Sequence, residues 1–156
     1  MRTLIALFLS PLVLAAAPPS DNVLDAFAPL VGHCWEGMVA ENALNVHCWD
    51  AVYGGAHIRD RHQVMVQGKV VYSGETIYSR EANSVRFTYW NSLGGGGTGT
   101  GSADDNGACF EGMVRATPDA ALQPSANCFI VKAEGGYVMT RLDGEPVRFT
   151  RSTQQF

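Results

Sequence analysis

One strand-like segment of the chain, residues 56–66, places an imidazole and a carboxylate close together. Asp60 and His62 are two positions apart, so in a β-strand both side chains point to the same face. The same face carries the apolar residues Ile58, Val64 and Val66, which predicts that it looks into the core. There His62 is a candidate to orient a ligand or to move a proton, because the pKa of histidine is easily tuned across neutrality. The alternative interpretation is a core histidine that Asp60 or a neighbouring strand holds by a hydrogen bond.

Two neighbouring segments offer further polar contacts. In residues 84–92 the better inward face carries Val85, Phe87, Tyr89 and Asn91. Tyr89 and Asn91 supply a hydroxyl and an amide to an aromatic-lined cavity, which suits polar recognition of a small molecule. In residues 70–79 neither face is cleanly apolar, so alternation leaves open whether Glu75 pairs with His62 as an acid and base or lies on the surface. The predicted lumenal ligand contacts are therefore His62, Tyr89, Asn91 and Glu75, in that order.

The four cysteines occur in two similar units. Residues 32–39, Gly-His-Cys-Trp-Glu-Gly-Met-Val, are echoed by residues 107–114, Gly-Ala-Cys-Phe-Glu-Gly-Met-Val, and a second cysteine–aromatic pair follows each unit. Alternation along a strand turns the aromatic side chains to the core and the cysteines outward. Four cysteines allow three pairings, of which the echo favours Cys34–Cys48 and Cys109–Cys128, each across one hairpin.

The sequence predicts neither a metal site nor a cofactor. His33-Cys34 and His47-Cys48 place histidines beside thiols, but adjacent strand residues point to opposite faces and do not readily share one ion. No C-x-x-C spacing occurs either. The glycine-rich residues 94–101 lack the G-K-[ST] ending of a phosphate loop, and no helix follows them. They are predicted to form a rim loop or a glycine-rich strand.

The N-terminal residues are typical of an export signal. A short basic start is followed by the mostly apolar residues 4–13, and the small residues around Ala16 offer a cleavage site. Residues 1–16 are the predicted signal, and residues 17–156 then form a single domain whose formal net charge is −5, since Arg2 is lost from the −4 of the whole chain. That mild acidity argues against nucleic acid and anionic membranes as partners. No apolar run reaches the length of about 20 residues that a membrane span needs, so we expect a periplasmic or secreted protein.

After residue 30 the chain is punctuated as short strands and tight turns. Residues 21–30 can first form a short helix with Val23, Leu24, Phe27 and Leu30 on one apolar side. Glycine-containing turns such as Gly54-Gly55 and Asn106-Gly107 supply the positive φ angles of hairpins. The expected strands are residues 34–39, 44–53, 56–66, 70–79, 84–92, 98–103, 108–115, 127–133, 137–142 and 145–150. This meander predicts an all-β fold, an antiparallel up-and-down barrel that leaves no exposed sheet edge.

The arrangement resembles the calycin superfamily of lipocalin and fatty-acid-binding barrels. A short helix leads through Gly32 into a first strand that bears Trp35, although the chain has Gly-x-x-Trp where calycins have Gly-x-Trp. In calycins an arginine of the last strand packs over that tryptophan and closes the barrel base. Arg148, or alternatively Arg151, is expected to do so here. Further patterns are similar to those of small uncharacterised bacterial barrels of this kind: Tyr53-Gly54-Gly55, His62, Gly74-Glu75-Thr76-Ile77-Tyr78 and Tyr89-Trp90-Asn91-Ser92.

The resemblance implies a ten-stranded barrel with a lumen that binds a small apolar or amphipathic molecule. Some relatives hold haem through a histidine late in the chain, but no histidine follows His62, so no haem ligand is expected. Two alternative functions stay open. One is an enzyme in which His62 and Glu75 perform acid–base chemistry on a lumen-bound substrate. The other is a barrel with a solid core that serves as a surface for a protein partner, since the abundant Tyr, Phe and Met can fill a small lumen.

Overall fold

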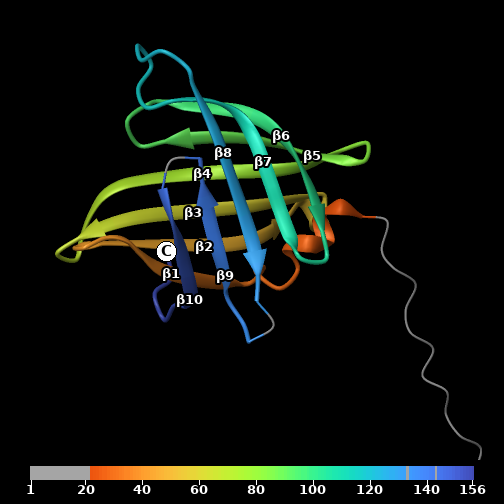
Figure 1. The fold of residues 1–156 in the computed structure, drawn as a ribbon, viewed down its shortest axis with the longest axis horizontal. Coiled ribbons are helices and arrows are strands. Elements are labelled where there is room, and N and C mark those ends of the chain that lie inside the picture. The colour runs from red at the N-terminus through yellow and green to blue at the C-terminus, as the bar shows by residue number, and fades with distance from the viewer. Residues whose placement is uncertain (1–21, 133, 143) are drawn as a thin grey trace, which may run out of the picture.

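The computed structural model describes residues 22–132, 134–142 and 144–156, and the predicted export signal lies outside them. The described chain folds into ten strands: β1 (His33–Ala40), β2 (Ala43–Val52), β3 (His57–Val66), β4 (Lys69–Glu81), β5 (Ser84–Asn91), β6 (Gly96–Asp104), β7 (Gly107–Arg115), β8 (Gln123–Val131), β9 (Tyr137–Arg141) and β10 (Gly144–Arg151). Each strand pairs antiparallel with the next, and β1 pairs with β10, so the sheet closes on itself (Figure 1). The predicted all-β antiparallel barrel is confirmed.

The N-terminal helix is shorter than expected and of another type. It is a 3-10 helix, η1 (Val23–Phe27), capped by the side chain of Asn22, which accepts a hydrogen bond from the main-chain N–H of Leu24 at 3.2 Å. Pro29 and Gly32, the latter with a φ of 79°, follow it and do not favour its extension. Leu24, Phe27 and Leu30 are buried, so η1 acts as a plug over one end of the barrel. Within the described residues no helix is long and apolar enough to cross a membrane.

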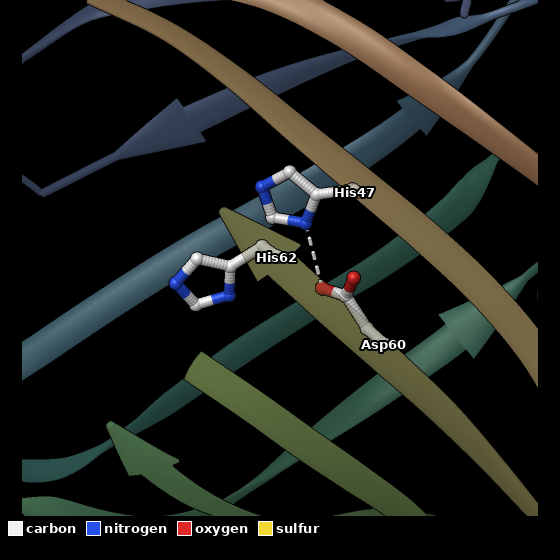
Figure 2. Close-up of side chains that lie close together, drawn as sticks. All are labelled: His47, Asp60 and His62. Carbon is white, nitrogen blue, oxygen red and sulfur yellow. Dashed lines mark hydrogen bonds and ion pairs between the residues drawn. The ribbon is translucent and has the colours of Figure 1, made fainter. Parts of the chain in front are cut away.

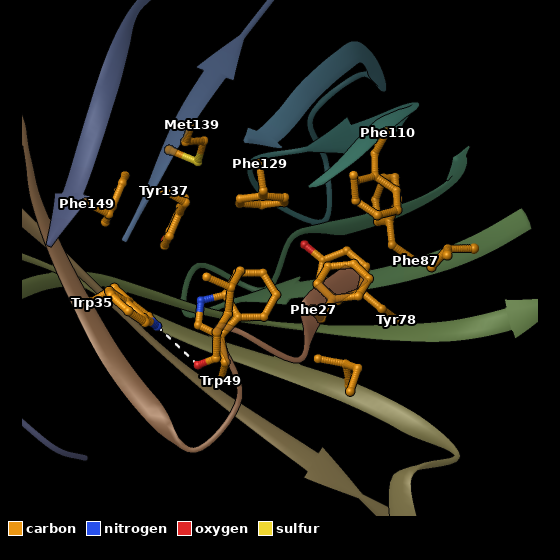
Figure 3. Packing of buried hydrophobic residues seen from close by; sticks show 14 of the residues in the cluster. Phe27, Trp35, Trp49, Tyr78, Phe87, Phe110, Phe129, Tyr137, Met139 and Phe149 are labelled. Atoms are coloured by element: carbon orange, nitrogen blue, oxygen red, sulfur yellow. Dashed lines mark hydrogen bonds between the residues drawn. The ribbon is translucent and has the colours of Figure 1, made fainter. Parts of the chain in front are cut away.

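Aromatic side chains fill the half of the barrel next to η1 (Figure 3). The ring of Phe27 lies 5.6 Å from that of Trp49 and 5.0 Å from that of Tyr78, measured between centroids. On the other side of Trp49, the rings of Tyr137 and Phe149 stack at 4.7 Å. Trp49, Tyr137 and Phe149 are completely buried, and large buried rings of this kind dominate the energetics of a core. This half of the barrel is packed solid.

Most of the glycine-rich residues, 96–101, lie in β6, in the barrel wall, while Gly94 and Gly95 belong to the turn before it; the sequence left a choice between a loop and a strand. Gly99 faces Phe87 across the β5–β6 pairing. A Cβ atom built on Gly99 would lie 2.5 Å from Phe87 Cε1, and one on Gly112 of β7 would lie 2.7 Å from Phe87 Cζ. The glycines are therefore the positions at which the wall gives room to the aromatic ring.

Both predicted disulfides are present. Cys34–Cys48 joins directly paired residues of β1 and β2, and Cys109–Cys128 joins directly paired residues of β7 and β8. Their side chains face away from the lumen because the neighbouring aromatics face into it.

The arginine that covers Trp35 is Arg151, which corrects the preference for Arg148. The guanidinium carbon of Arg151 lies 5.4 Å from the centroid of the Trp35 ring, and the two residues are direct partners across β1 and β10. Arg151 shares its strand face with Phe149, which points inward. Arg148 is on the opposite face, where it forms an exposed ion pair with Glu134 at 2.7 Å. Alternation along β10 thus decides between the two arginines.

Candidate functional site

A cavity of about 290 Å³ occupies the half of the barrel that lies away from η1. Its floor is the top of the aromatic core, formed by Tyr78, Phe87, Phe110, Phe129 and Met139. Ser125, Asn127 and Arg141 line the wall on β8 and β9. Besides Val64 and Thr76, the wall on β2 to β5 carries six larger polar residues, Asn45, His47, Asp60, His62, Tyr72 and Tyr89. We call these six residues the polar cluster. The lumen is therefore neither empty throughout nor filled throughout.

The polar cluster is organised around His47, which lies between an amide and a carboxylate. The Nδ1–H of His47 donates to Oδ2 of Asp60 at 2.7 Å, because a carboxylate oxygen can only accept (Figure 2). Nε2 of His47 lies 2.9 Å from Nδ2 of Asn45, which is therefore its donor as the amide is oriented. The side chains of His47 and Asp60 are only 6% and 2% exposed. These two contacts fix the orientation and tautomer of the His47 ring.

His62 stacks inside the same cluster. It is the direct cross-strand partner of His47, and the two ring centroids are 5.0 Å apart. On its other side the ring lies nearly parallel to that of Tyr89, at 5.9 Å. The hydroxyl groups of Tyr89 and Tyr72 are hydrogen-bonded to each other. His62 is thus held by flat contacts and leaves its ring nitrogens for other partners.

Gly74 of β4 makes room for these rings. A Cβ atom at this position would lie 2.6 Å from His62 Cε1 and 2.7 Å from Tyr89 Cε2, closer than side chains approach one another in proteins. Gly74 pairs with His62 on one side and with Asn91 on the other. The absence of a side chain there sets how closely the two rings lie against β4.

Burial controls the protonation of the cluster. The pKa of His62 falls from 6.5 to about 4, chiefly because burial penalises the imidazolium and additionally because of His47, while Asp60 acts in the opposite direction. His62 is accordingly a neutral imidazole at pH 7. Burial, reinforced by the hydrogen bond with Tyr72, raises the pKa of Tyr89 far above its usual value, so its hydroxyl keeps its proton.

Three buried atoms of the cluster have no hydrogen-bond partner among residues 22–132, 134–142 and 144–156. They are Oδ1 of Asn45, Oδ1 of Asp60 and Nδ1 of His62. A buried polar atom without a partner typically destabilises a fold by about 1–3 kcal/mol. Three such atoms so close together mark a place where a bound group is stabilising.

The structure brings together two of the four predicted ligand contacts. His62 and Tyr89 line the cavity. Glu75 and Asn91 do not line this cavity; they border a second, more open groove, whose lining includes Arg61, Trp90 and also His62. Asn91 lies at the end of β5, where its Oδ1 accepts hydrogen bonds from the N–H groups of Leu93 and Gly95 at 2.9 and 3.1 Å.

Glu75 faces outward because its neighbour Thr76 lines the lumen. The proposed acid–base pair of His62 and Glu75 therefore does not share the cavity. The carboxylate in the cluster is that of Asp60, and its hydrogen bond goes to His47 rather than to His62.

Sequence analysis missed His47, Asn45 and Tyr72. Trp49 is buried inside the barrel, and alternation along β2 from that residue places His47 and Asn45 on the same inward face. The sequence therefore contained the information that His47 points inward. The sequence analysis considered His47 only in its argument against a metal site made of histidine and cysteine side chains. The inward direction of Tyr72 could not be assigned, because both faces of its strand carry polar and apolar residues.

Comparison with known proteins adds no family to this picture. No protein-family model matches the chain, and no curated protein matches its sequence. The structure itself shows a closed ten-stranded antiparallel barrel, which is consistent with the resemblance to calycins.

Proposed function

We propose that this protein is an exported, calycin-like barrel that binds one small amphipathic molecule in its lumen. The observation that carries the proposal is the asymmetric cavity, which has an aromatic floor and a polar wall. Small-molecule sites are typically concave and mostly apolar, with a few converging polar groups that fix the orientation of the ligand. The aromatic floor receives the apolar part, and His62 and Tyr89 face the polar part.

The volume and shape of the cavity limit the ligand. At about 290 Å³ the cavity is just below the range of about 300–1,000 Å³ found for small-molecule pockets, which favours a small ligand. Phe87, Phe110 and Phe129 offer ring faces and edges, which favour a flat apolar group. The neutral His62 and the protonated Tyr89 offer hydrogen bonds to the polar part of the ligand, and Arg141, which also lines the cavity, offers a positive charge.

Two features support export. Disulfides persist in oxidising compartments such as the periplasm or the extracellular space, and the barrel carries two of them. The N-terminal sequence offers the corresponding signal in residues 1–16.

The two alternative functions receive less support. Acid–base catalysis by His62 with Glu75 on a substrate in the lumen requires both side chains at the cavity, and Glu75 borders only the outer groove, which His62 also reaches. A solid core describes only the half of the barrel next to η1, since the other half is hollow.

Native mass spectrometry of the protein purified from its own exported compartment tests the proposal. We expect an added mass that is released on denaturation. Val114 lines the cavity, and Met113 beside it on β7 faces outward and is 42% exposed. Val114→Trp should therefore abolish the added mass, whereas the matched control Met113→Trp should retain it. A wild-type barrel that stays bare even after incubation with a panel of small aromatic amphiphiles would contradict the proposal.

A further inference from the structure

Three potential metal ligands converge in the wall of the lumen. One ring nitrogen each of His47 and His62 and one carboxylate oxygen of Asp60 all lie within 4.8 Å of one another (Figure 2). The strand register builds this group: His47 and His62 are paired across β2 and β3, and Asp60 precedes His62 by two positions on the same face. The group is part of the rigid sheet rather than of a loop.

The geometry suits a small divalent ion. First-row metals lie about 2.0–2.2 Å from imidazole nitrogen and carboxylate oxygen, so two ligand atoms of one ion are about 3–3.5 Å apart. Nδ1 of His47 and Oδ2 of Asp60 are 2.7 Å apart and all three ligand atoms lie within 4.8 Å of one another, so the side chains must shift slightly to surround an ion. Two imidazoles with one carboxylate form a donor set that first-row transition metals favour.

Unpartnered atoms in the cluster point to a missing ligand. Asp60 is 2% exposed, yet its Oδ1 has no donor within the described parts of the chain. Nδ1 of His62 is likewise buried and unpartnered. A metal ion between these side chains would be a partner for both atoms, Oδ1 of Asp60 and Nδ1 of His62.

Asn45 fits the surroundings of a metal-bound histidine. Its Oδ1 is buried without a partner, while its Nδ2 faces Nε2 of His47. The oxygen and nitrogen of a side-chain amide exchange places by a simple rotation. After that rotation Oδ1 accepts a hydrogen bond from Nε2–H and leaves Nδ1 of His47 to the metal, which is the support that metal-binding histidines usually receive.

We propose that His47, Asp60 and His62 bind one divalent first-row transition metal ion, with Zn²⁺ the simplest occupant. The ion takes the place of the proton between Nδ1 of His47 and Asp60, and the neutral ring keeps its one proton, which moves to Nε2 and faces Oδ1 of Asn45. Three protein ligands leave at least one coordination position open toward the lumen, beside Tyr72 and Tyr89. The sequence analysis predicted no metal site because it weighed only histidines adjacent to cysteines, whose side chains point to opposite faces. Two histidines that are paired across neighbouring strands, by contrast, share a face. The proposal does not depend on an organic ligand.

Calorimetric titration of chelator-treated protein with Zn²⁺ alone tests the site at pH 7. We expect saturation at one ion per chain, confirmed by elemental analysis after gel filtration. His62→Gln removes a ligand and should weaken binding at least about a hundredfold, since even the loss of a residue that only supports a ligand weakens metal sites about 10–100-fold. The matched control is the double variant His33→Gln/His57→Gln, which removes the two remaining histidines of the chain and should bind as the wild type does.

Nuclear magnetic resonance of the wild-type histidine side chains provides a test that no folding defect can obscure. On addition of Zn²⁺, the ring nitrogens of His47 and His62 should shift, and those of His33 and His57 should not. Absence of stoichiometric binding, equal affinity in His62→Gln, loss of binding in the double control variant, or shifts confined to His33 and His57 would each overturn the proposal.

Discussion

Nδ1 of His47 lies 2.7 Å from Oδ2 of Asp60, and both side chains are almost completely buried in the barrel wall. The contact joins neighbouring strands at the level where the solid aromatic core gives way to the cavity. One side of the contact faces the half of the barrel that aromatic side chains fill, and the other faces the half that contains the cavity. Asp60 is among the largest fully buried side chains of the protein, in the company of Trp49 and Tyr137.

Removing the Asp60 carboxylate should destabilise the barrel strongly. In Asp60→Ala, His47 loses its acceptor while staying buried, and breaking a buried pair in this way typically costs about 3–5 kcal/mol. Urea unfolding of chelator-treated protein measures the effect. Asp50→Ala is the control, because Asp50 pairs with Arg59 and Arg61 on the outer face, where all three side chains are about one-third exposed. We expect at most about 1 kcal/mol there. Equal losses in the two variants would contradict the assigned role of Asp60.

Stability of the metal-free barrel should fall on mild acidification because of His62. Its pKa is about 4 in the folded protein and 6.5 in the unfolded chain, so the unfolded chain binds more protons between these values. The free energy of unfolding is therefore highest above pH 6.5 and should drop by about 2 kcal/mol between pH 7 and pH 5. His47, Asp60, Tyr72 and Tyr89 face the His62 ring. In His62→Gln this part of the slope should disappear, and an unchanged slope would show that other groups cause it.

Local sequence rules were sufficient for the fold and for half of the site. Turn residues and alternation gave the ten strands, and the echo of residues 32–39 in residues 107–114 gave both disulfides. The inward direction of His62 followed from the apolar residues on the same face of its strand.

The wrong predictions concern side chains whose direction is not decided by the local sequence. Glu75 lies in a strand with two mixed faces, so only the three-dimensional register decides its direction. Asn91 is the last residue of its strand, where capping of the following turn replaces alternation. The pairing of His47 with His62 depends on the register between two strands, as the choice of Arg151 depends on the pairing of the first strand with the last. Such registers are set by the packing of the whole barrel.

Replacing Arg151 should affect the base of the barrel more than replacing Arg148. Arg151 lies over the Trp35 ring, a contact worth about 0.5–1 kcal/mol at an exposed site and more where water is excluded. Arg148 pairs with Glu134 in an exposed ion pair, for which less is expected. Thermal unfolding and the tryptophan emission of Arg151→Ala and Arg148→Ala measure this. Only Arg151→Ala should change the emission of Trp35; an equal change in Arg148→Ala would contradict the assignment.

Each disulfide should stabilise the barrel to a similar extent. They link residues 14 and 19 positions apart, and closing loops of this size in the unfolded chain is worth about 3 kcal/mol. Cys34→Ala/Cys48→Ala and Cys109→Ala/Cys128→Ala should therefore lower the free energy of unfolding by similar amounts. Neither bridge lines the cavity, so the folded fraction of each variant should keep the wild-type ligand mass. A variant that folds but loses the ligand would show that its bridge shapes the lumen.

Gly74 should be essential for the arrangement of the polar cluster. A methyl group there collides with the rings of His62 and Tyr89, so one ring must move into the cavity or β4 must shift. Overpacking of this kind typically destabilises a core by about 1–3 kcal/mol. Ser73→Ala on the adjacent, outward-facing position is the control and should be close to neutral. Gly74→Ala should also weaken Zn²⁺ binding, because His62 then leaves its place beside His47 and Asp60. Wild-type stability and affinity in Gly74→Ala would mean that the wall of the lumen is more compliant than its close contacts indicate.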